Sequence, residues 1–258
     1  MAECLHQLGR VSFNFSRNED ATKFFQEALS IFREIRGEKS SEVAESLVGL
    51  GNATGNHEKA TQYYHEALSI SRELFGTKHL IVARCLHNLG VTCIDCGRYD
   101  DARRFLEEAL AIQLEICGEK QEQVAISLTN LGRLHLKCSR FETARHFMER
   151  ALNIRRDIGN QLRVGRGLYH LGSLIEKEGK INTAADYYSR ALEVIRRYEF
   201  LPENHLYVRE AVEALRRVKG ATDSRSTTAS DIPSFTKRKA DDLTSSIKLQ
   251  HPRKVIKC

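Results

Sequence analysis

Cys93 and Cys96 are the clearest candidates for chemistry, because a Cys-x-x-Cys spacing serves both zinc binding and thiol redox reactions. A structural zinc site needs about four ligands, and no second pair with suitable spacing occurs. A redox pair is activated at the start of a helix, whereas both cysteines fall at the end of a predicted helix. We therefore expect Cys93 to lie in the core and Cys96 at a helix end, without a metal.

The other reactive side chains show no arrangement that is typical of an active site. None of the ten histidines lies in a His-Glu-x-x-His or comparable spacing, and the Gly-x-Lys segments lack the second glycine and the hydroxyl of a phosphate-binding loop. No pattern places a nucleophile beside a base. The sequence therefore predicts no catalytic residues, no cofactor and no enzyme.

Basic residues form two kinds of cluster. Arginine doublets with nearby glutamates recur along the first 200 residues, and we expect them to be solvated and ion-paired rather than to bind nucleic acid. The doublets are Arg103-Arg104, Arg155-Arg156 and Arg196-Arg197. Residues 220–258 hold eight lysines and arginines against four aspartates and are rich in serine and threonine, so they predict a disordered basic tail.

The composition restricts the location of the protein. No apolar run is long enough to span a membrane, and the first 20 residues are too charged for a signal peptide. Seven scattered cysteines favour a reducing compartment, so we predict a cytoplasmic protein without a membrane partner. In the tail, Lys237-Arg238-Lys239 and Arg253-Lys254 are spaced loosely like a bipartite nuclear import signal, which leaves the nucleus open as an alternative.

A repeat organises the first 200 residues. The dipeptide Leu-Gly recurs five times, at intervals of 42, 39, 42 and 40 residues, and each copy is followed by two alanines that are seven residues apart. Pro is absent from this stretch, and periods of this length indicate stacked helix pairs. The small residues mark the places where paired helices approach closely. Between the helices of a pair, Gly97 and Gly179 suit the left-handed position after a helix, and we expect Asp100 and Asn182 to cap the next helix.

This pattern resembles the tetratricopeptide repeat. The long period and the linkers GTKHLIVARCLHNLG and GEKQEQVAISLTNLG are similar to the extended repeats, of about 42 residues, in kinesin light chain and nephrocystin. The linker GNQLRVGRGLYHLG is more similar to the repeats of G-protein-signalling modulators of the LGN type. The resemblance implies an all-α, right-handed α-solenoid of stacked helix-turn-helix repeats whose first helices line a concave groove.

We predict the following organisation. Five repeats fill residues 1–200, and residues 203–219 form a polar helix that caps the last repeat, ahead of the tail at 220–258. No polar helix precedes the first repeat, so we expect either a longer protein or self-association through that end. The expected repeats are 1–39, 40–78, 79–120, 121–160 and 161–200.

The resemblance also implies which residues face the groove. In the family, groove contacts come from the first helix, six and three residues before the repeat glycine and one and five residues after it. Transferred to this chain, these positions give the central and later repeats five basic residues on one surface, diluted by Asp95, which suits acidic or carboxylate-bearing peptides. The predicted groove residues are Asn52, Arg84, His87, Arg133, Lys137, Arg166, Tyr169 and Lys177.

The sequence therefore predicts a non-catalytic scaffold for protein–protein interaction. Its partner is expected to be a peptide or a helix of another protein, bound in the groove, and the basic groove residues favour an acidic one. The alternative is an adaptor that associates with nucleic acid or the nucleus through the basic tail. Steep salt dependence of binding would favour that alternative, because phosphate contacts release counterions.

Overall fold

The computed structural model describes residues 1–197 and 206–227, and these residues form helices joined by short turns. The chain is all-α in this part, which confirms the predicted fold class. The helices are α1 Ala2–Asn14, α2 Asn18–Arg36, α3 Ser41–Ala53, α4 His57–Phe75, α5 Leu80–Asp95, α6 Tyr99–Cys117, α7 Glu122–Lys137, α8 Phe141–Ile158, α9 Gln161–Lys177, α10 Ile181–Arg196 and α11 Leu206–Thr227.

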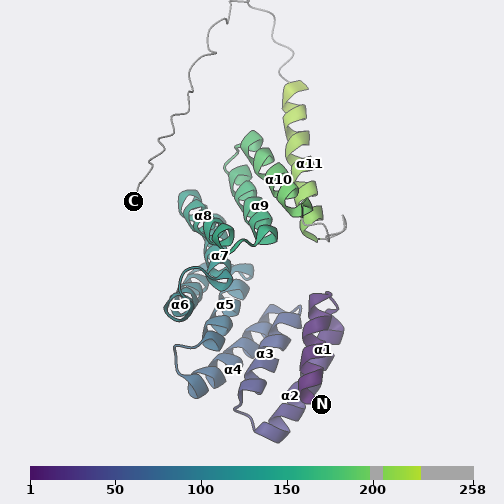
Figure 1. Ribbon diagram of the computed structural model, residues 1–258, viewed down its shortest axis with the longest axis vertical. Helices are drawn as coiled ribbons and strands as arrows, with labels where there is room; N and C mark the ends of the chain where they lie inside the picture. The colour runs from purple at the N-terminus through teal and green to yellow at the C-terminus, as the bar shows by residue number, and fades with distance from the viewer. Residues whose placement is uncertain (198–205, 228–258) are drawn as a thin grey trace, which may run out of the picture.

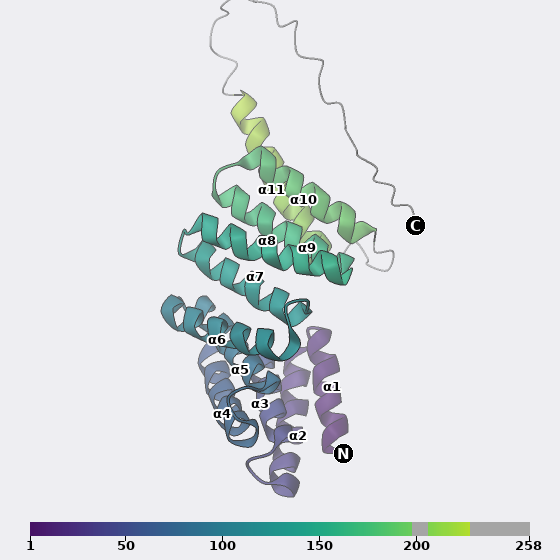
Figure 2. The ribbon, with the colours of Figure 1, turned by 60° about the vertical axis from the view of Figure 1, so that its left-hand side comes forward.

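The helices stack in the order of the sequence. Each odd-numbered helix from α1 to α9 packs most closely on the helix that follows it, and each even-numbered helix also contacts the next pair. Figure 1 shows the pairs following one another along a curve, with α1 at one end and α11 at the other. Figure 2 shows the same stack from the side, with α11 lying against α10. This arrangement is a right-handed α-solenoid.

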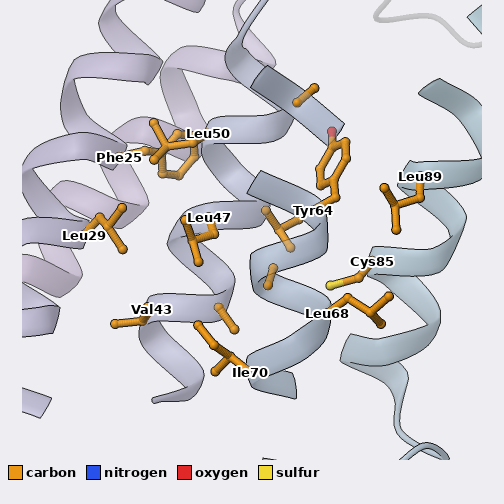
Figure 3. Close-up of a cluster of buried hydrophobic side chains, with 14 of the residues drawn as sticks. Phe25, Leu29, Val43, Leu47, Leu50, Tyr64, Leu68, Ile70, Cys85 and Leu89 are labelled. Atoms are coloured by element: carbon orange, nitrogen blue, oxygen red, sulfur yellow. The ribbon is translucent and has the colours of Figure 1, made fainter. Parts of the chain in front are cut away.

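Small residues on the second helix of each pair allow close packing. The two alanines of each unit are at most 5% exposed, and most of them are fully buried. The repeat glycine lies opposite a large side chain of the paired helix: a Cβ atom at Gly51 would lie 2.4 Å from the Tyr64 ring, and one at Gly132 would lie 2.7 Å from Cγ of Met148. Figure 3 shows the resulting core, in which Phe25 of α2 lies against Leu47 and Leu50 of α3.

The turn inside each pair is closed by backbone hydrogen bonds. Gly97 and Gly179 adopt the expected left-handed conformation, with φ of 74° and 81°. Ser16 and Ser139 unexpectedly occupy the same place in their turns, with φ of 59° and 57°. After Gly97, the N–H of Arg98 donates to the carbonyl of Cys93 at 2.8 Å.

The predicted caps at Asp100 and Asn182 are wrong. The helix α6 begins at Tyr99 and α10 begins at Ile181, so both side chains lie inside the first turn. The closed turn leaves only one residue between the left-handed glycine and the helix, and a lysine or arginine occupies it. Asp100 then acts through its charge near the helix N-terminus instead of as a cap.

The helix α11 lies where the cap was predicted. It covers α10 and contacts α9, and it continues to Thr227, beyond the expected end at residue 219. The rest of the predicted tail, including the two basic clusters, lies outside the described residues. The division into five repeats with the boundaries given above stays a prediction. Among the described helices, none combines the length and the apolar character that crossing a membrane requires.

Candidate functional site

The concave side of the stack holds a cavity of about 780 Å³, lined mainly by α5, α7 and α9. Arg84 does not line it but lies in a neighbouring cavity of about 320 Å³, and Asn52 lines both. Arg84 is instead paired with Glu45 of α3 at 3.3 Å. The structure thus brings seven of the eight predicted groove residues to one surface: Asn52, His87, Arg133, Lys137, Arg166, Tyr169 and Lys177.

Asn52 is held by two hydrogen bonds to its carbonyl oxygen. The hydroxyl of Tyr64 donates to Oδ1 at 2.7 Å, and the amide of Asn88 donates to the same atom at 3.1 Å. Burial raises the pKa of Tyr64 far above its usual range, so its hydroxyl remains a donor. Because both bonds use the oxygen, the amide nitrogen of Asn52 has no side-chain partner among the described residues and is available to donate to a ligand.

His87 belongs to a partly buried polar chain that links α5, α6 and α7. The amide of Asn130 donates to Nε2 of His87 at 3.1 Å, which leaves Nδ1–H to donate to Oγ of Ser127 at 3.1 Å. The hydroxyl of Ser127 in turn donates to Oε1 of Gln113 at 2.8 Å. Burial lowers the pKa of His87 from 6.5 to about 4, so the ring is a neutral, oriented part of the wall at neutral pH.

The two groove arginines are held differently. Arg133 donates to Oδ1 of Asn130 at 3.0 Å and lies 4.0 Å from the carboxylate of Asp95. Arg166 stacks over the ring of Tyr207 in α11, with 4.3 Å from its guanidinium carbon to the ring centroid. The cap, for which only a structural role was predicted, therefore contributes to the site.

Cations outnumber anions in the lining of the cavity. Six lysines and arginines line it against Asp95 and Glu210. Neither Lys137 nor Lys177 has an ion-pair partner among the residues that the structure describes. The pKa of the neighbouring His170 is lowered to about 3, by burial and then by Arg166, Arg133 and Arg155. The basic lining residues are Arg133, Lys137, Arg155, Arg163, Arg166 and Lys177.

Arg155 corrects one expectation of the sequence analysis. We expected its doublet to be solvated, but Arg155 is 3% exposed and reaches the cavity from α8, a second helix. Its Nε donates to Glu122 at 3.3 Å, whereas Nη1 is buried and has no hydrogen-bond partner among the described residues. Burial is the main cause of the lowered pKa of Arg155.

The repeat alignment contained the signal for this burial. Arg155 follows the second repeat alanine by four residues, and the residues at this position in the other units are also buried, at 7% exposure or less. These counterparts are Phe32, Ser71, Gln113 and Ile195. The doublet Arg103-Arg104 behaves as expected, because both arginines are exposed and pair with Asp100 and Asp101.

The cysteine pair has the environment that was expected for packing residues. Cys93 is 1% exposed and burial raises its pKa, whereas Cys96 is exposed. The burial of Cys93 and the exposure of Cys96 both follow from the position of the pair at the end of α5. In the described part of the chain, no three His, Cys, Asp or Glu side chains are grouped as a metal site requires.

Several solved structures have the same fold. BtubC (BKLC) from P. vanneervenii superposes with a TM-score of 0.60 at 20% identity, over 95% of this chain and 87% of that chain. A putative kinesin light chain with TPR-like repeats from Podosopora anserina superposes with a TM-score of 0.62 at 15% identity, over 76% of this chain and 95% of that chain. The Rap conjugation gene regulator of the plasmid pLS20 superposes with a TM-score of 0.66 at 19% identity, over 86% of this chain and 62% of that chain.

Sequence comparison gives the family. No curated protein matches the chain significantly. Tetratricopeptide repeat family models match residues 1–42, 52–115 and 87–157, which together make up more than half of the chain. These matches fall on the helix pairs that build the solenoid, and the predicted resemblance is confirmed: the chain belongs to the tetratricopeptide repeat family.

Proposed function

We propose that the chain is a non-catalytic scaffold that binds an extended, acidic segment of a partner protein in the concave cavity. The observation that carries this proposal is the excess of basic side chains on a surface built from several successive first helices. Arginine forms paired hydrogen bonds with planar carboxylates, so Arg133 and Arg166 are suited to glutamate and aspartate side chains.

Support for a peptide ligand also comes from proteins with the same fold. The Rap regulator of the plasmid pLS20 was solved in complex with the Phr* peptide, and another Rap protein was solved with competence and sporulation factor. In this chain, Asn52 offers a fixed amide donor for the backbone of a ligand. The ring of Tyr169 lies beside that of Tyr188, with 5.6 Å between the ring centroids, and it offers an apolar surface for the side chains of the ligand.

The test is fluorescence anisotropy with two labelled peptide pools of equal length, one rich in glutamate and one rich in lysine. We expect the glutamate-rich pool to bind and the lysine-rich pool to stay free. The double substitution Arg133→Glu, Arg166→Glu should lower the affinity for the glutamate-rich pool by about tenfold or more, because it removes two of the six basic side chains of the cavity and adds two negative ones.

The matched control reverses the same number of charges outside the cavity. Arg104→Glu and Arg190→Glu change two exposed arginines of the second helices α6 and α10, which do not line it. This variant should bind as the unchanged protein does. Equal loss in both variants would show that total charge, not the cavity, decides the binding. Retained binding by the Arg133/Arg166 variant would contradict the proposal. It would favour the alternative, in which the basic residues 220–258 make the contact.

A further inference from the structure

Three arginines from successive helices gather around His170 in the concave cavity. Arg133 of α7, Arg155 of α8 and Arg166 of α9 all line the cavity, and Figure 2 shows these helices side by side. We call these three residues the arginine triad. His170 lies near all of them, since each one lowers its pKa, whereas no carboxylate among the described residues raises it.

The repeat explains why Arg133 and His170 are neighbours. Arg133 follows its repeat glycine by one residue, as Asn52 does, and His170 precedes its own by two residues, as Asn88 does. Asn52 and Asn88 hold these positions two units earlier, where the amide of Asn88 donates to Asn52 at 3.1 Å. Side chains at the two positions therefore meet across successive first helices. In α7 and α9 they are a guanidinium group and an imidazole ring.

Arg155 adds a donor that the protein itself does not satisfy. Its side chain is 4% exposed, and its Nε donates to Oε1 of Glu122 at 3.3 Å. Its Nη1, on the other side of the guanidinium group, has no hydrogen-bond partner in the described part of the chain. Glu122 is shared, because Nε of Arg163 lies 3.8 Å from the same oxygen. One carboxylate thus faces two guanidinium groups, and a buried cation with an unused donor is stabilised by a further anion.

The partner that this position has in the preceding unit is missing beside Arg155. Its counterpart in α6 is Gln113, which accepts a hydrogen bond from the hydroxyl of Ser127 at 2.8 Å. The counterpart of Ser127 in α9 is Gly167, five residues before the repeat glycine in each case. A Cβ atom at Gly167 would lie 3.6 Å from Nη1 of Arg155. Arg155 therefore faces a glycine where Gln113 faces a hydroxyl, so the neighbouring helix offers no side chain to pair with it.

We propose that the arginine triad binds the phosphate group of a phosphoserine or phosphothreonine in the acidic segment, an inference that rests on the proposed function. A phosphate carries up to two negative charges and three terminal oxygens, so it can accept from guanidinium groups on three helices at once. A carboxylate has one charge and two oxygens. Asp95 and Glu210 also line the cavity, but six basic side chains oppose them, so a dianion still meets an excess of positive charge.

The test compares three pools of labelled peptides by fluorescence anisotropy at constant salt. It is made at about pH 7.5, where a phosphoserine carries close to two negative charges. The first pool is the glutamate-rich pool with phosphoserine at one central position. The second has serine there, and the third has serine there and two added glutamates, which match the total charge of the first. We expect the first pool to bind about tenfold more tightly than the third, because only the phosphate concentrates its charge on the triad.

Single substitutions in the triad provide the second arm. Arg155→Gln should reduce the tenfold difference to about twofold, and the fold should be kept because glutamine already holds this position in α6. Arg166→Gln, at a half-buried position, should give the same loss without a change in the core. The matched control is Arg150→Gln, also on α8, whose side chain pairs with Glu119 and does not line the cavity. This control should keep the full difference.

The outcomes separate this proposal from the proposed function. Equal affinity for the first and third pools would overturn the phosphate site and leave the binding of acidic segments intact, whereas failure of all three pools would overturn both. A difference that Arg155→Gln and Arg166→Gln both keep would also overturn the site. So would a 5′-phosphorylated oligonucleotide that displaces the first pool at a lower concentration than unlabelled phosphoserine peptide does, because the triad would then serve nucleic acid.

Discussion

At the scale of single residues, the repeat glycines allow the two helices of a pair to pack closely, because glycine has no side chain. A Cβ atom at Gly132 would approach Met148 to 2.7 Å and the carbonyl oxygen of Ala144 to 3.1 Å. Alanine normally stabilises a helix relative to glycine by about 1 kcal/mol. Here we expect Gly132→Ala to lower the free energy of unfolding by about 1–3 kcal/mol through overpacking, as measured by denaturant titration.

Gly220 provides the control for this prediction. It lies in α11, and a Cβ atom there would meet nothing within 4 Å. Gly220→Ala should therefore leave the stability unchanged or raise it slightly. If Gly132→Ala also raised the stability, the close approach of α7 and α8 would not be the reason for glycine at this position.

The neutral state of His87 makes the stability depend on pH. Its pKa is about 4 in the folded chain against an ordinary value of 6.5, so the unfolded state binds the proton more tightly. The stabilising effect is complete above the ordinary pKa and is lost as the pH falls towards the folded value. As the pH falls from about 7 to about 5, His87 should lower the free energy of unfolding by about 2 kcal/mol.

The variant His87→Gln tests this assignment. Glutamine keeps a donor and an acceptor for Ser127 and Asn130 but does not titrate, so the unfolding free energy should fall less steeply on acidification. The exposed His146 is the matched position, and His146→Gln should leave the slope as it is. An unchanged slope in His87→Gln would show that the ring is protonated or solvated in the folded chain.

At the scale of helices, Glu176 ties the cap to the last pair. Its carboxylate in α9 accepts from the hydroxyl of Tyr188 at 2.6 Å and from Nε and Nη2 of Arg217 in α11, both at 2.8 Å. The hydrogen bonds from Arg217 are the main reason that the pKa of Glu176 is lowered. We expect Glu176→Ala to cost about 1–2 kcal/mol, since it leaves charged and polar donors without their partner.

Amide hydrogen exchange shows which helices lose stability in Glu176→Ala. Amides of α11 should exchange faster in Glu176→Ala, while those of α1 to α4 should not change, because they do not contact the cap. Glu213→Ala removes an exposed carboxylate from α11 itself and should have little effect. Faster exchange in both variants would mean that the carboxylate network is not what holds the cap.

At the scale of the whole molecule, each unit contacts only its neighbours, so a lesion in the middle interrupts the stack. Ala109 is fully buried on α6, and Ala109→Asp should cost about 3 kcal/mol or more by burying an unpaired charge. We expect a lower melting temperature by circular dichroism and a broader transition, as the two sides of the stack unfold separately.

The control lies on the same helix. Ala111 is exposed, and Ala111→Asp introduces the same side chain with only the small cost of its lower helix propensity. Its melt should be close to that of the unchanged chain. A melt of Ala109→Asp that matched the control would contradict the packing of α6 on its neighbours.

The sequence by itself determined the repeat, the helix pairs and the side of each first helix that faces inwards. The repeat and the helix pairs follow from spacing, because a fixed period and the geometry of the α-helix assign equivalent positions to one face. The side that faces the groove followed from the resemblance to the tetratricopeptide repeat, and seven of the eight residues that it named, from Asn52 to Lys177, line one surface. The small residues at close contacts were predictable on the same grounds.

Only the tertiary structure decided which charges remain unpaired and which second-helix residues reach the cavity. Arg84 pairs with Glu45, Arg166 stacks on Tyr207 of the cap, and Arg155 of α8 lines the cavity. These contacts join residues that are about one repeat or more apart in the sequence. They depend on the angle and distance between successive pairs, which set the reach of long side chains and which a one-dimensional period does not contain.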